Sequence, residues 1–260
     1  GQAMERTKKS SADRLYKIFI YVALITLAVT IIIPVAWVFM ASIKENSEFY
    51  GNPWAMPAGF YIQNFADAWG KARMGEYMFN SVVVTALALV ILLVVALPAA
   101  YVLSRFEFKG RKFLNVAFMG GLFINVNYIV VPIFLMLVDG DKLLKNSFGG
   151  GFFLNNIVVL AVVYASTALP FTIYLLSGYF ATLAHDYEEA AYIDGAGYGT
   201  TMLKIIFPMA QPSIITVILF NFLSFWNEYI IAMTLLSDPK GSKTLPVGLM
   251  QLTQAQQSAA

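Results

Sequence analysis

The sequence predicts an all-α integral membrane protein, a polytopic bundle of spanning helices, from two observations. Hydrophobic residues make up 59% of the 260 residues and charged residues only 12%, about half of the charged share of a soluble domain. Apolar runs recur along the chain, and each exceeds the ~20 residues that a helix needs to cross a bilayer core. We expect five spans, at residues 18–43, 78–104, 113–138, 152–180 and 213–236.

The first four spans lie in runs without any Asp, Glu, Lys or Arg, and the fifth contains one charge, Glu228. The first run is too long for a removable signal peptide and lacks a small-residue cleavage site. Glycines 149–151 break the fourth run, so its span is expected to begin near Phe152. Prolines inside the runs are compatible with spanning helices when neighbours satisfy the freed carbonyls. These prolines are Pro34, Pro98, Pro132 and Pro170.

Cationic residues near the span ends predict the orientation. Residues 1–17 form a basic segment, which is expected to be cytoplasmic, ahead of a transmembrane domain at 18–260. The link between the second and third spans is also basic, with Arg105, Lys109, Arg111 and Lys112. Alternation then puts residues 44–76, 139–151 and 237–260 outside, and the acidic link 185–212 in the cytoplasm. The Trp- and Tyr-rich loop 44–76 is expected to lie along the membrane interface.

Several function classes are excluded. A net charge of +2 does not indicate nucleic acid, and a chain without cysteine has no thiol nucleophile or disulfide. The glycines at 195, 197 and 199 have no preceding strand and no following Gly-Lys-Ser/Thr, so they do not form a phosphate loop. His185 is interpreted as a solvated neighbour of a helix cap. We therefore predict no catalytic residue, metal site or cofactor in this chain.

The cytoplasmic link contains the least membrane-like interior sequence. Asp186 and Glu189 have the spacing of a reciprocal capping pair, followed by a short helix over 187–193 that Gly195 or Gly197 can end. A second amphipathic stretch, 200–207, is expected to stop before Pro208, and Pro212 suits the first turn of the fifth span. Because so short a helix is marginal alone, the link predicts a protrusion that receives force from a soluble partner.

These residues resemble a known family. Glu189-Ala190-Ala191, then Gly195, then Ile205 and Phe207-Pro208 look like the E-A-A, Gly, I-x-L-P loop of ABC importer permeases, with Phe207 in place of the usual Leu. The longer string 189–196, Glu-Ala-Ala-Tyr-Ile-Asp-Gly-Ala, resembles the carbohydrate-uptake branch, in particular the second permease subunit of maltose-type importers.

The resemblance implies a mechanism and its partners. A second homologous permease subunit would complete the pathway, two ATPase subunits would carry ATP and Mg, and an extracellular or periplasmic protein would deliver the sugar. It also implies a sixth span after residue 260 and a prokaryotic plasma (inner) membrane. The residues that it implies for ATPase coupling are Asp186, Glu188, Glu189, Ala190, Ala191, Asp194, Gly195 and Pro208.

Polar residues inside the spans are candidates for a substrate pathway. Glu228 is a candidate because an ionisable residue in a span is functional by default, and Asn221 would share its side of the helix. The alternatives are hydrogen bonds between helices and a carboxylate that reaches outward. The full set is Asn125, Asn127, Tyr128, Asn221, Trp226, Asn227 and Glu228. The region 237–254 is our candidate for contact with the binding protein.

The sequence therefore predicts the permease subunit of an ABC importer that moves a sugar or oligosaccharide by alternating access, with ATP hydrolysis on another chain. One alternative is a permease for another solute class, such as polyamine, phosphate or amino acid. A non-transport membrane scaffold or an intramembrane enzyme is the alternative from a different class, and the absence of paired catalytic residues argues against the enzyme.

Overall fold

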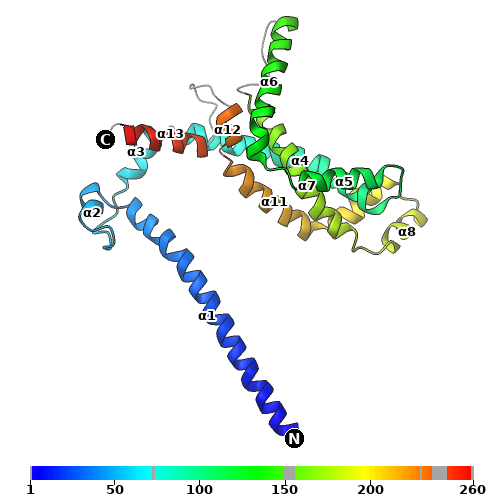
Figure 1. Cartoon of the computed structure of the whole chain (residues 1–260), viewed down its shortest axis with the longest axis horizontal. Helices are drawn as coiled ribbons and strands as arrows, with labels where there is room; N and C mark the ends of the chain where they lie inside the picture. The colour runs from blue at the N-terminus through cyan, green and yellow to red at the C-terminus, as the bar shows by residue number, and fades with distance from the viewer. Residues whose placement is uncertain (1, 72–73, 149–155, 229, 236–244, 259–260) are drawn as a thin grey trace. The chain divides into compact units, whose positions relative to one another are not determined.

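The computed structural model describes residues 2–71, 74–148, 156–228, 230–235 and 245–258, and no strand occurs among them (Figure 1). The chain divides into two compact units, Gly1–Lys71 and Ala72–Ala260. The all-α fold class is therefore confirmed for the described part of the chain.

The first unit is one long helix followed by a folded segment. Helix α1 (Gln2–Ser42) continues through Pro34, and α2 (Asn46–Gly51) and α3 (Gln63–Lys71) follow it. Lys44 is buried and its Nζ donates to the Pro53 carbonyl at 3.2 Å, as does Trp37 Nε1 at 3.0 Å. The segment predicted as an interfacial loop thus contains two helices and is tied to the end of α1.

The second unit is built around two long helices. These are α4 (Met74–Arg105) and α7 (Ile157–Phe180), which pack along each other (Figure 1). Ala88, Leu92, Ala96 and Ala100 form a fully buried stripe on α4. Because three of these four side chains are small, the two backbones can approach closely, as is typical of helices in membranes.

Shorter helices complete the second unit. They are α5 (Arg111–Gly121), α6 (Val126–Phe148), α8 (Asp186–Ile193), α9 (Tyr198–Thr201), the π-helical turn η1 (Met202–Ile206), α10 (Phe207–Met209), α11 (Gln211–Trp226), α12 (Ile230–Leu235) and α13 (Leu245–Ser258). Helix α11 packs on both α4 and α7, and α5 packs on α7. Helix α13 packs on α4, although no helix is predicted from the sequence within residues 237–260.

The expected five continuous spans are not what the structure shows. Among the described residues, three helices are long and apolar enough to cross a membrane: Ser10–Ser42, Met74–Arg105 and Ile157–Phe180. A fourth span would arise if Tyr198–Met209 and Gln211–Trp226, which meet at a bend of 77°, are taken as one. Helices α4, α6 and α7 continue through Pro98, Pro132 and Pro170 as predicted.

Two predicted spans are interrupted. The third, 113–138, ends as a helix at Gly121, and the amides of Leu122 and Phe123 bond back to Met119 and Gly120 in a tight turn. Two consecutive glycines weaken the helix there. A Cβ on Gly121 would lie 2.6 Å from Pro170 Cγ, so the glycine also lets α5 pack against α7. The fifth, 213–236, ends as α11 at Trp226 and resumes as α12.

Candidate functional site

The short helix α8 begins one residue earlier than the capping pair predicts. Its N-cap is His185, whose carbonyl accepts from the amides of Glu188 and Glu189, and its side chain forms no capping bond. The predicted reciprocal pair of Asp186 and Glu189 is therefore wrong, because Asp186 lies inside the first turn. Three acids in that turn still interact favourably with the helix dipole.

The end of α8 is as predicted. Gly195 has a φ of +86°, a left-handed conformation that costs a residue with a Cβ about 1–2 kcal/mol. Its amide bonds to the Tyr192 carbonyl at 3.1 Å, and the Ala196 amide bonds to the Ala191 carbonyl at 2.9 Å. This pair of bonds is a Schellman motif, which satisfies the last carbonyls of the helix. Gly195 rather than Gly197 ends the helix.

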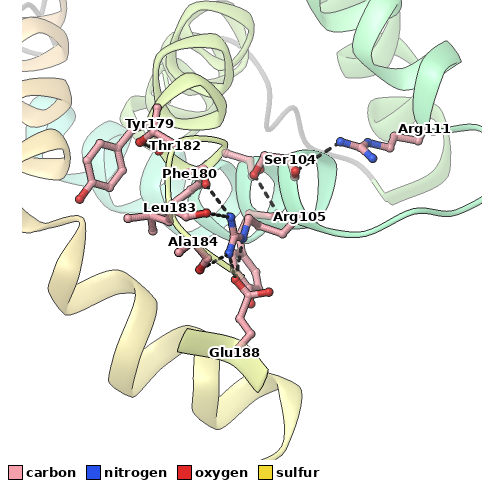
Figure 2. A network of polar contacts seen from close by, with 11 residues as sticks. Ser104, Arg105, Arg111, Tyr179, Phe180, Thr182, Leu183, Ala184 and Glu188 are labelled. Carbon is pink, nitrogen blue, oxygen red and sulfur yellow. Dashed lines mark hydrogen bonds and ion pairs between the residues drawn. The ribbon is translucent and has the colours of Figure 1, made fainter. Parts of the chain in front are cut away.

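A buried ion pair attaches α8 to the rest of the unit (Figure 2). Arg105 Nε donates to Glu188 Oε1 at 2.6 Å, and the exposed fractions of the two side chains are 1% and 7%. The guanidinium also donates to the carbonyls of Phe180, Leu183 and Ala184. Arg105 ends α4, and these carbonyls belong to the last residue of α7 and the segment after it. One side chain therefore joins α4, α7 and α8.

Sequence reasoning treated Arg105 only as an orientation marker and so missed this role. Glu188 and Glu189 are adjacent in a short helix, and they cannot both face a partner. From that adjacency, the sequence could have predicted that one of the two glutamates is buried and pairs with a cation.

Aromatic packing fixes the segment that follows α8. Phe180 and Phe207 stack with ring centroids 6.0 Å apart, and Tyr198 meets Phe106 edge-on at 5.6 Å. The Tyr179 hydroxyl donates to the Met209 carbonyl at 2.8 Å. These contacts tie α9 and α10 to the ends of α4 and α7. Burial, followed by the charge of Glu188, raises the pKa of Tyr192 in the same cluster.

The helix preceding α11 does not stop before Pro208, contrary to prediction. The chain runs on to Met209 because η1 is π-helical and the Phe207 amide bonds to the Met202 carbonyl. Proline lacks an amide hydrogen and its ring clashes with the carbonyl four residues earlier, so a locally wider turn accommodates it. Pro212 lies in the first turn of α11, as predicted.

The predicted coupling residues divide into two groups. Glu188 and Ala191 are buried against the chain itself, so they are removed from the predicted docking surface. The other members are exposed: Asp186, Glu189, Ala190, Asp194, Gly195 and Pro208. Ile193 is 85% exposed and adds an apolar group to this acidic face. We call Asp186, Glu189, Ala190, Ile193 and Asp194 the α8 outer face.

A separate cavity lies between α7 and α11. It has a volume of about 320 Å³ and is lined in part by Tyr164, Asn221, Phe225 and Glu228. Asn221 Nδ2 donates to Thr172 Oγ1 at 3.1 Å, which joins the two helices. Glu228 Oε1 accepts from the Ile231 amide at 3.3 Å. Asn221 and Glu228 thus line the same cavity, but they do not share a side of one helix as predicted, because α11 ends at Trp226.

Four further pathway candidates, Asn125, Tyr128, Trp226 and Asn227, do not line this cavity. Asn227 bonds to the Leu223 carbonyl of its own helix, and Trp226 stacks on Phe222. Asn125 is exposed, and Tyr128 is 82% exposed. The side chain of Asn127 lies outside the described residues, as do residues 237–244 of the predicted contact region.

These features define a polytopic α-helical membrane protein with a short helix attached at the ends of its two long helices. The chain belongs to the family described as binding-protein-dependent transport system inner membrane component, whose model matches residues 72–260. It is therefore a membrane-embedded permease subunit, not an enzyme, of an importer that also comprises an ATPase and a substrate-binding protein.

The relatives agree with this assignment. The chain is 36% identical to a diacetylchitobiose uptake system permease of Streptomyces coelicolor, over 88% of this chain and 72% of the relative. It is 33% identical to a probable ABC transporter permease of Bacillus subtilis, over 93% and 75%. A solved bacterial ABC transporter involved in alginate import shares the fold, with a TM-score of 0.74 and 24% identity over 93% of this chain and 80% of the other.

Proposed function

We propose that this chain moves a sugar or oligosaccharide into the cell by alternating access, driven by an ATPase that docks on the α8 outer face. The observation that carries the docking role is the division of α8 into a buried side and an exposed side. Glu188 and Ala191 hold the helix to its own chain, while Glu189 and Ile193 remain available. An exposed acid beside an exposed apolar side chain suits a groove that contains a cation.

The proposed cycle uses this arrangement. When ATP closes the ATPase pair, the docked α8 is displaced, and the inner ends of the long helices are displaced with it. The spans then tilt to open the pathway outward, and release of ADP lets them return. The second homologous permease subunit, the pair of ATPases and an external sugar-binding protein are the partners that this proposal requires.

The sugar class is proposed from the relatives. Several are named as permeases of sugar uptake systems, for diacetylchitobiose, for melibiose, raffinose and stachyose, and for trehalose and maltose. The discriminating experiment is uptake of radiolabelled di- and oligosaccharides beside a polyamine, phosphate and amino acids. Uptake of only a non-sugar solute would replace the sugar proposal and leave the docking proposal standing. Absence of an ATPase from the native complex would favour a non-transport scaffold.

Docking is tested with Glu189→Lys, and Glu107→Lys is the matched control. Both acids are exposed, but Glu107 lies in the link between α4 and α5. If α8 docks, an affinity tag on this chain will retain the ATPase subunits with Glu107→Lys and lose them with Glu189→Lys. Equal retention by the two variants would refute the docking role.

The proposed orientation has a cytoplasmic N-terminus and a cytoplasmic α8. Because the chain contains no cysteine, single cysteines can report it. A cysteine at Tyr198, in α9, is expected to react with a reagent supplied only from the cytoplasm. A cysteine at Gly59, in the segment between α2 and α3, is expected to react only from outside. The reverse pattern would put α8 on the wrong side for an ATPase.

A further inference from the structure

The guanidinium of Arg105 lies at a junction of three segments. Its donors are shared between the Glu188 carboxylate on α8, the carbonyl of the last residue of α7 and two carbonyls of the segment after it, while its own backbone ends α4 (Figure 2). The last carbonyls of a helix have no partner within the helix. Arg105 therefore bonds the last carbonyl of α7 and two carbonyls just after it, and it neutralises the acid of α8 at the same point.

Stability alone does not account for such a pair. Removing two charges from water is costly, and apolar residues of the same volume are often as stabilising. The planar guanidinium instead offers five donors in a fixed geometry. Few other side chains can bond a carboxylate and several carbonyls in different directions. The arrangement therefore fixes the position of α8 relative to both long helices.

We propose that Arg105 is the positioning residue through which displacement of α8 is delivered to the inner ends of α4 and α7. This proposal rests on the docking role of α8. The chain connects α8 to α7 through residues 181–185 and to α11 through α9, η1 and α10. Without Arg105, a displaced α8 would therefore pull on α7 and α11 through these links and would have no ion pair to α4. With Arg105 in place, α8 and the inner ends of α4 and α7 form one body.

A second attachment makes this body complete. Tyr179 and Phe180, in the last turn of α7, contact Met209 and Phe207 of α10. The segment from α8 to α10 is thus held at its start by Arg105 and at its end by α7. The 77° bend before α11 follows directly after the second attachment. A displacement of α8 would then move α4 and α7 together. The bend before α11 would change its angle, so that α11 need not move with them.

The chain offers a matched control for the test. Arg111 lies in the same basic link, and its guanidinium donates to the carbonyls of Leu103 and Ser104 in α4 (Figure 2). It is a half-buried arginine that caps α4, and these bonds do not reach α7 or α8. Arg105→Met and Arg111→Met therefore remove the same charge from the same region, but only the first removes the junction.

The experiment compares these variants in the complete complex in membrane vesicles, with radiolabelled diacetylchitobiose, trehalose and maltose as probes. We expect Arg105→Met to retain the ATPase subunits and to lower the sugar moved per ATP hydrolysed about tenfold. Arg105→Lys, which keeps the charge but has fewer donors, is expected to lose less. Arg111→Met is expected to keep the wild-type ratio. Glu188→Gln, which preserves the shape of the side chain, is expected to lower the ratio without adding to the effect of Arg105→Met.

Two results would overturn the proposal. One is an equal ratio for Arg105→Met and Arg111→Met. The other is loss of the ATPase subunits with Arg105→Met, because Arg105 would then only maintain the fold of α8. The docking proposal fails separately, when Glu189→Lys retains the ATPase subunits as well as Glu107→Lys does, and the sugar proposal fails when only a non-sugar solute is taken up.

Discussion

Two regions of the second unit contain a glutamate among mostly apolar residues, and the environments of the two carboxylates differ. At α8, the Glu188 carboxylate is buried and bonded to Arg105. Between α7 and α11, Glu228 lines a cavity of about 320 Å³, and the contact of its Oε1 is the amide of Ile231.

This difference in environment indicates different roles for the two carboxylates, one in attaching α8 and one in contact with a solute. A buried carboxylate that is bonded to a cation is a fixed point, because breaking the pair leaves an uncompensated charge. A carboxylate beside open space and aromatic rings retains acceptor capacity for a solute hydroxyl. We therefore propose that Glu188 belongs to the mechanical part of the permease, and Glu228 stays a pathway candidate.

The largest effect on stability is expected at Glu188. Glu188→Gln should lower the free energy of unfolding by about 3 kcal/mol, because Arg105 is left buried without its counter-charge. Glu189→Gln, one residue on and exposed, should change it little. Thermal unfolding of the purified chain in detergent measures both. Similar losses for the two variants would contradict the division of α8 into a buried and an exposed side.

A smaller effect is expected at the end of α8. Gly195→Ala should cost about 1–2 kcal/mol, because its φ of +86° is unfavourable for a residue with a Cβ. Gly199→Ala is the control, since Gly199 lies in α9 and a Cβ there would meet open space. The control should be neutral or gain about 0.5 kcal/mol from the higher helix propensity of alanine. The same thermal assay checks the pair, and an unaffected Gly195→Ala would remove the Schellman motif from the account of α8.

The smallest effects on stability are expected in the cavity, where they separate its two polar residues. Asn221→Ala should cost about 1 kcal/mol through the lost bond to Thr172. Glu228→Gln keeps an oxygen that can accept from Ile231, so it should leave unfolding unchanged while altering uptake kinetics of the transported sugar. Normal uptake by Glu228→Gln would reduce Glu228 to a cap of α12.

Much of the architecture follows from the sequence by itself. Long uncharged runs favour spanning helices, because backbone groups in lipid must be satisfied within the segment. That argument predicts α1, α4 and α7 and their internal prolines correctly. The Gly195 turn is likewise local, since only the residue at that position determines whether a positive φ is tolerated.

Tertiary structure determines where the predicted spans are interrupted and which residues the buried charges pair with. Hydropathy averages over a window, so it does not register the turn after Gly121 or the break after Trp226. The capping prediction was wrong because α8 begins at Asp186, so that His185 is the N-cap. The spacing of Asp186 and Glu189 alone does not determine where the helix begins. The pairing of Arg105 with Glu188 joins residues 83 positions apart, and only the packing of α4 against α7 brings them together.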